Sequence, residues 1–136
     1  MVGALEGIRL VLEPRADVRL AYVFGSTARG EARPESDVDV AVLFDPEPGP
    51  RHLDSLTSDL QAAARRPVDL VVLNTAPPLL VHQILKTGRR VLTRAEDERV
   101  RFETRATARY LDTAHLRRVQ HQYLRERADA FRARQP

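Results

Sequence analysis

Three short runs of apolar and β-branched residues restrict most narrowly what this chain can fold into. They lie at residues 18–24, 37–44 and 68–73, and runs of this length and composition are typical of β-strands. The last run is almost wholly apolar, which predicts a central strand that is buried on both faces. Stretches with apolar residues at helical spacing precede, separate and follow these runs. The 136-residue chain is therefore predicted to form a single α/β domain.

The helical stretches and one further strand complete the predicted order of elements. Helices are predicted over residues 2–13, 53–64 and 77–86, and a short strand near residues 90–92. Gly88 is expected to end the third helix as its C′ residue. Thr93 and Glu96 have the spacing of a capping box, which predicts a mostly helical tail from about residue 94, with room for an interruption near Asp112.

These elements suggest how the chain is organised and where it resides. We expect residues 1–93 to form the core and residues 94–136 to be a helical extension of the same domain. The chain has no cysteine, which fits a reducing compartment. It shows no signal-peptide pattern at its N-terminus, and no apolar run approaches the roughly 18 residues of a membrane span. We therefore expect a cytoplasmic protein without membrane association.

The net charge of +3 comes from the tail. Residues 94–136 contain 11 arginines and 7 acidic residues, whereas residues 1–93 contain 11 basic and 12 acidic residues. Across the chain, 21 of the 22 basic residues are arginines, a bias that genomic base composition can produce without any function. The charge alone gives no reason to expect direct binding of nucleic acid, although the tail could face an acidic or RNA-bearing partner.

Two aspartates interrupt the second apolar run. Asp37 and Asp39 are two residues apart in a predicted strand, so their side chains project from the same face. Two neighbouring carboxylates repel each other unless a cation lies between them. Such oxygen ligands suit Mg²⁺, which completes its coordination with substrate phosphates and water. The pair therefore predicts a metal site that also binds a nucleoside triphosphate.

The turn after the first run offers what a triphosphate needs. Gly25 has no Cβ, so the backbone can approach a phosphate closely, and the Ser26 hydroxyl can donate a hydrogen bond to it. Arg29 could either contact phosphate through a charge-assisted bond or hold the loop by pairing with an aspartate. The sequence leaves these two roles of Arg29 open.

Each of these features has an ordinary explanation when it stands alone. A Gly-Ser dipeptide after a strand is usually a turn, an Asp-x-Asp pair is usually solvated surface, and a single arginine is usually an exposed ion-pair partner. Together, however, they form Gly-Ser, ten intervening residues and Asp-x-Asp, set in a strand, turn, strand context. This combination is far more specific than its parts.

The run from Phe24 to Leu43 resembles the polymerase-β-type nucleotidyltransferase superfamily, and within it the small minimal nucleotidyltransferases (MNT). Weaker similarity extends over residues 68–74, 77–88 and 110–112, so the resemblance covers nearly the whole chain. It implies a mixed, twisted sheet flanked by helices. It also implies an antitoxin of a HEPN/MNT toxin–antitoxin pair, which would transfer AMP from ATP to a tyrosine of the HEPN toxin and silence its RNase activity, with one or two Mg²⁺ ions.

The resemblance also implies a third carboxylate on a neighbouring strand, and Asp69 is the candidate. It would complete the metal site with Asp37 and Asp39 and help to deprotonate the attacking hydroxyl. Independently, a single carboxylate in a strand that is expected to be buried would cost several kcal/mol of desolvation unless it were paired or metal-bound. The plainer alternative is an aspartate at a strand edge that caps a neighbouring turn.

Two other functional classes stay open on the sequence alone. The chain could be a binding antitoxin whose tail blocks a toxin and whose nucleotide site is vestigial. It could also transfer nucleotides to a small molecule or to an RNA end. Because the predicted sheet and its helices already occupy residues 1–93, we expect another molecule to present the acceptor hydroxyl. Leu116, Val119 and Tyr123 in the tail could dock a helical partner, while the tail up to about Tyr110 is expected to pack on its own sheet.

Overall fold

A computed structural model of the protein describes residues 3–25 and 36–134. In these residues helices and strands alternate much as the sequence predicts. In chain order the elements are α1 (Ala4–Leu12), β1 (Val18–Phe24), β2 (Val38–Phe44), α2 (Pro50–Ala64), β3 (Val68–Val72), α3 (Pro78–Thr87), β4 (Arg89–Thr93) and α4 (Glu96–Ala133). None of the helices in the described residues is both long and apolar enough to cross a membrane.

The strands form one mixed sheet in the order β3-β2-β1-β4. β1 runs antiparallel to both β2 and β4, whereas β2 and β3 are parallel. A parallel pair needs a crossover connection, and α2 provides it. The predicted mixed sheet flanked by helices is therefore confirmed.

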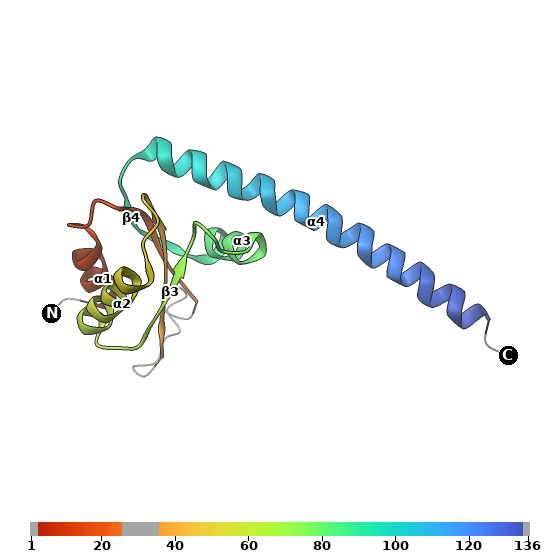
Figure 1. Cartoon of the computed structure of the whole chain (residues 1–136), viewed down its shortest axis with the longest axis horizontal. Coiled ribbons are helices and arrows are strands. Elements are labelled where there is room, and N and C mark those ends of the chain that lie inside the picture. Colours follow the sequence, from red (N-terminus) through yellow and green to blue (C-terminus); the bar gives the residue numbers. More distant parts are fainter. Residues whose placement is uncertain (1–2, 26–35, 135–136) are drawn as a thin grey trace.

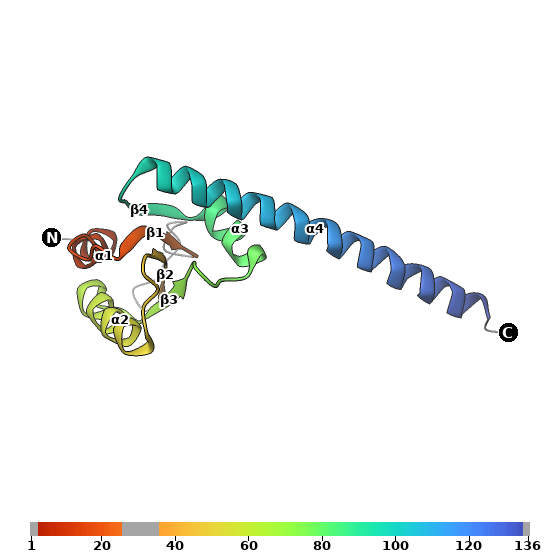
Figure 2. The same cartoon turned by 45° about the horizontal axis from the view of Figure 1, so that its top comes forward.

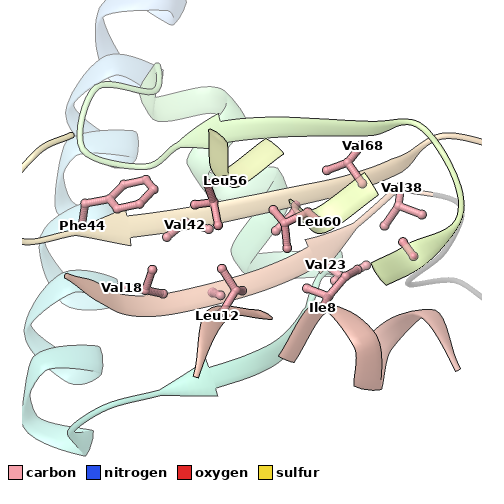
Figure 3. Close-up of a cluster of buried hydrophobic side chains, with 13 residues drawn as sticks. Ile8, Leu12, Val18, Val23, Val38, Val42, Phe44, Leu56, Leu60 and Val68 are labelled. Carbon is pink, nitrogen blue, oxygen red and sulfur yellow. The ribbon is translucent and has the colours of Figure 1, made fainter. Parts of the chain in front are cut away.

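One face of the sheet is covered by α1 and α2 (Figures 1 and 2). Ile8 and Leu12 of α1 and Leu56 and Leu60 of α2 are fully buried against alternate residues of the strands (Figure 3). Val38, Val40 and Val42 all point into this cluster. Since side chains alternate along a strand, the residues between these valines point to the opposite face of the sheet, and Asp39 is one of them.

The opposite face is covered by α3 and by the first half of α4. Val81 and Ile84 of α3 and Ala106 of α4 are buried there beside Tyr22 of β1. The Tyr22 hydroxyl donates a hydrogen bond of 2.9 Å to Glu103 of α4. Burial, together with the neighbouring Glu103 carboxylate, raises the pKa of Tyr22 well above its ordinary value. This bond ties α4 to the centre of the sheet.

The prediction that residues 68–73 form a central strand is wrong. Among the strands of the described residues, β3 pairs only with β2 and lies at the edge of the sheet, and Asp69 is exposed to solvent. Its apolar residues Leu70, Val71 and Val72 are half-buried, because helices cover both faces even at this edge. The desolvation argument for a catalytic Asp69 therefore fails, and any role for this residue has to rest on where the strand register places it.

The structure also corrects three local expectations. Gly88 ends α3 with φ −81°, outside the left-handed region; glycine is needed because a Cβ would lie 2.5 Å from the Ile84 carbonyl oxygen and 3.2 Å from that of Val23. The capping box is absent, since Ala95 is the N-cap residue of α4 and makes no side-chain cap. The helix then runs for 38 residues without an interruption near Asp112.

Candidate functional site

Three carboxylates gather at one end of the sheet. Asp39 near the start of β2 lies between Phe24 of β1 and Asp69 of β3 in the strand register. Directly paired residues on parallel strands are about 4.8 Å apart and project to the same face. Asp37 lies two residues before Asp39, just outside β2. The structure thus brings the three aspartates to one end of the sheet, although Asp37 and Asp69 are 32 positions apart in the sequence.

The electrostatics of Asp39 reflect this crowding. Asp39 is half-buried, whereas Asp37 and Asp69 are exposed. Burial raises the pKa of Asp39 above its ordinary value, and the charges of Asp69 and then of Asp37 raise it further. The ionised form of Asp39 is therefore disfavoured by its two neighbours, and a bound cation would relieve that repulsion.

Gly25 is required at this end of the sheet for two reasons. Its φ of +72° lies in the left-handed region, which residues with a Cβ rarely adopt. In addition, a Cβ at this position would collide with Oδ2 of Asp39. The turn after β1 and the carboxylate at the start of β2 are therefore in contact, and glycine leaves the space that the Asp39 side chain occupies.

The other two residues predicted for phosphate binding, Ser26 and Arg29, lie outside the described residues. Their roles stay predictions. Gly25, which precedes them, is at the same end of the sheet as the carboxylates. A triphosphate bound next to Gly25 would therefore lie beside the acidic cluster.

The pairing of β4 with β1 brings two arginines, which the sequence analysis did not single out, toward the same end of the sheet. Arg89 pairs with Val23 and Arg90 with Tyr22, so both lie toward the end of the sheet at which β1 runs into Gly25. Both are exposed, and Nη1 of Arg90 lies 3.9 Å from Oε2 of Glu96 in an ion pair. The only signal for them would have been a prediction that the strand after Gly88 pairs with β1, and local periodicity does not contain strand order.

Comparison with known proteins identifies the family. The family described as "Polymerase beta, Nucleotidyltransferase" matches residues 6–97 of this chain. The chain belongs to this nucleotidyltransferase family. The matched segment contains the acidic cluster and the Gly25 turn, and it ends within the first turn of α4.

Relatives of this nucleotidyltransferase include a protein of Shewanella oneidensis named protein adenylyltransferase MntA. The two are 30% identical over 91 residues, which are 67% of this chain and 66% of the relative, just under two thirds of its length. A second protein named protein adenylyltransferase MntA, from Thermococcus cleftensis, is 36% identical over 75 residues, 55% of this chain and 76% of the relative.

Among solved structures, one chain in a toxin–antitoxin crystal structure with AMP-PNP is similar with a TM-score of 0.77. The identity is 24%, and the match covers 88% of this chain and 97% of that one. Another is described as a tri-AMPylated Shewanella oneidensis HEPN toxin in complex with an MNT antitoxin, with a TM-score of 0.72, 22% identity and coverage of 89% and 95%. At these identities the likeness shows the fold.

The acidic end of this nucleotidyltransferase has a donor set that fits Mg²⁺. Within residues 3–25 and 36–134, no three histidine or acidic side chains come close enough together to enclose a metal ion. Mg²⁺, however, is usually held by one or two protein carboxylates and by substrate phosphates rather than by a cage of protein ligands. Hard carboxylate oxygens that are open to solvent on one side, with Asp69 and Asp37 close enough to raise the pKa of Asp39, match this requirement.

Proposed function

We propose that this chain is a Mg²⁺-dependent protein adenylyltransferase that moves AMP from ATP to a tyrosine hydroxyl of a HEPN RNase toxin and so neutralises it as an antitoxin. Membership of the nucleotidyltransferase family supports the reaction class. The names of its relatives, and the AMPylated toxin in a similar solved structure, support the acceptor. The observation that carries the proposal is that Asp39 lies between the Gly25 turn and Asp69 at one end of the sheet.

Asp37 and Asp39 would hold the Mg²⁺, one ion or two, and Asp69, beside Asp39 in the strand register, would have to move closer to serve as a further ligand. Bound there, Mg²⁺ would neutralise charge on the triphosphate and make the α-phosphorus more electrophilic. Gly25 would let the backbone approach the phosphates, the Ser26 hydroxyl would donate to a phosphate oxygen, and Arg29 would either contact phosphate or hold the loop. The residues of the chain thus position the reactants, which is the larger part of catalysis in phosphoryl and nucleotidyl transfer.

Asp69 would act on the acceptor. Its exposed carboxylate lies beside Asp39 on the edge strand, where a hydroxyl from another protein can reach it. In the proposed step Asp69 orients the acceptor hydroxyl and accepts its proton, while the hydroxyl oxygen forms a bond to the α-phosphorus of ATP. The bond between the α-phosphorus and the bridging oxygen breaks, and pyrophosphate leaves. An edge strand suits this role better than the buried central strand that the sequence predicts.

The proposed function is tested by incubating the protein with ATP, Mg²⁺ and the product of the adjacent gene. Intact mass followed by peptide mapping should show one or more AMP units on a tyrosine of that product. Transfer to an RNA end or a small molecule instead would disprove the antitoxin assignment and keep the nucleotidyltransferase. ATP binding without transfer to any acceptor, or no binding of ATP with Mg²⁺, would indicate a non-catalytic binding antitoxin.

A further inference from the structure

The second half of α4 extends away from the domain. Phe102 and Ala106 in the first half pack against the sheet, and the Tyr110 ring stacks on the His82 ring of α3 with centroids 3.6 Å apart. Beyond this stack the helix continues past α3 (Figures 1 and 2), and every residue from 115 to 134 is exposed. A helix without tertiary contacts is only marginally stable in water, so this segment gains most from a partner.

This segment carries an apolar stripe. The α4 stripe consists of Leu116, Val119, Tyr123, Leu124 and Phe131, whose exposed fractions range from 51% to 65%. At about 100° per residue, these side chains fall within a sector of about 140° of the helix surface. Single exposed apolar residues are common on protein surfaces, but five in one sector of an unpartnered helix are typical of an interaction surface.

The charge of the segment indicates what kind of surface covers the stripe. Residues 115–134 hold six arginines and two acidic residues. Arg127 lies within the sector of the stripe and places its guanidinium 5.7 Å from the centre of the Tyr123 ring. Arg117 lies at the edge of the sector, 5.5 Å from the centre of the Tyr110 ring. The apolar surface is therefore combined with positive charge.

Three other occupants fit less well. A second copy of α4 would bring two strongly basic segments together, with like charges inside the interface. A lipid layer would have to desolvate Arg127 among the apolar residues of the stripe. An RNA strand would match the arginines but would leave leucine and phenylalanine side chains facing water and phosphates. An apolar protein groove with an acidic rim matches both features.

We propose that the α4 stripe, with Arg117 and Arg127, is a docking surface for an acidic protein partner that presents an apolar groove. The proposal rests on the proposed function in taking this partner to be the protein that supplies the acceptor hydroxyl. Docking on α4 holds that hydroxyl at a high effective concentration near the acidic cluster. Binding and transfer are separable steps and can be measured separately.

The test is calorimetric titration of the full-length protein with the product of the adjacent gene. The variant Leu116→Gln/Val119→Gln/Tyr123→Gln keeps good helix formers along α4, which circular dichroism can verify, and should weaken binding by about tenfold or more. Arg117→Gln/Arg127→Gln should weaken binding and make it less sensitive to salt. The matched control Arg118→Gln/Arg125→Gln removes the same charge from the opposite side of α4 and should change the dissociation constant by less than about twofold.

Each other result overturns the proposal. These results are no binding by the wild type, equal binding by the triple variant, or equal weakening by both arginine pairs, the last being the outcome expected for RNA or another diffuse charge effect. Self-association of the wild type that the triple variant abolishes would assign the stripe to a second copy. Failure of the proposed function looks different: the wild type would bind the partner tightly, the triple variant would not, and no AMP would be transferred by either.

Discussion

Asp39 is the residue of the candidate site whose ionised form the fold disfavours. Its pKa is raised by burial and by the charges of Asp69 and Asp37, so the folded protein binds a proton there more readily than the unfolded chain does. Far below the ordinary pKa of 3.8, Asp39 is protonated in both states and costs nothing. As the pH rises from there through the raised pKa, the folded state progressively loses stability relative to the unfolded state.

Asp39→Asn should therefore stabilise the protein at neutral pH in the absence of metal. The gain should shrink as the pH falls and disappear below about the ordinary pKa of 3.8, because only the charged form is penalised. Thermal unfolding across a pH series measures this. Asp54→Asn, at an exposed position on α2, serves as a control and should show no such pattern. A loss of stability at pH 7 in the Asp39 variant would show that the carboxylates do not repel.

Gly25→Ala tests the contact between the turn and the acidic cluster. The left-handed φ of +72° should cost about 1–2 kcal/mol of stability with any residue that has a Cβ. The new Cβ should also displace Asp39 and reduce transfer. Gly49→Ala is the matched control, since Gly49 has φ −79° and its Cβ would meet nothing within 4 Å. Similar effects of the two substitutions on transfer would remove Gly25 from the site.

At the scale of elements, Arg94 joins the end of the sheet to the first connection of the chain. It follows β4, and its guanidinium donates hydrogen bonds of 2.5 to 3.1 Å to four backbone carbonyls. These carbonyls belong to Leu12, Glu13, Arg15 and Val18, where the chain passes from α1 into β1. Nothing in the sequence around Arg94 indicates this role, because its partners are about 80 residues away.

Arg94→Ala should lower the free energy of unfolding by about 2–3 kcal/mol, because several carbonyls would lose a charged donor and are partly shielded from water. Urea unfolding measures the loss. Arg101→Ala is the control: Arg101 is exposed and makes one ion pair of 3.5 Å with Asp97, so its loss should cost less than about 0.5 kcal/mol. If both substitutions cost the same, Arg94 does not stabilise the turn between α1 and β1.

The elements also show what local sequence can and cannot predict. Alternation places Val38, Val40 and Val42 on one face of β2, so the strand and the opposite direction of Asp39 are readable from the sequence. The edge position of β3 is not, because strand order depends on pairing between distant segments. The apolar composition of β3 resembles that of a central strand because helices cover both faces of this small sheet up to its edge.

The same division applies to the site. The spacing of Asp37 and Asp39 and the glycine at position 25 mark the site in the sequence itself. That Asp69 lies beside Asp39 follows from the register of two parallel strands, which the resemblance to nucleotidyltransferases could suggest but periodicity could not. The contact between Gly25 and Asp39, and the position of Arg89 and Arg90, are visible only in three dimensions.

At the scale of the whole molecule, we expect the stability of the catalytic domain not to depend on the second half of α4. Of the residues that a chain ending after Ala114 loses, residues 115–134 are exposed throughout, so its melting temperature should change by less than about 3 °C. Differential scanning calorimetry of both proteins measures this. The shorter chain should still bind ATP with Mg²⁺, and loss of cooperative unfolding would show that the projecting helix is part of the domain.

The catalytic role of the acidic cluster is tested most directly by the rate of AMP transfer to the partner, measured for the wild type and for Asp39→Asn across a Mg²⁺ titration. We predict transfer that requires Mg²⁺ in the wild type, and a loss of about a hundredfold or more in the variant at every Mg²⁺ concentration. Circular dichroism should show that the variant remains folded. Transfer by Asp39→Asn at the wild-type rate would contradict the claim that these carboxylates form the catalytic site.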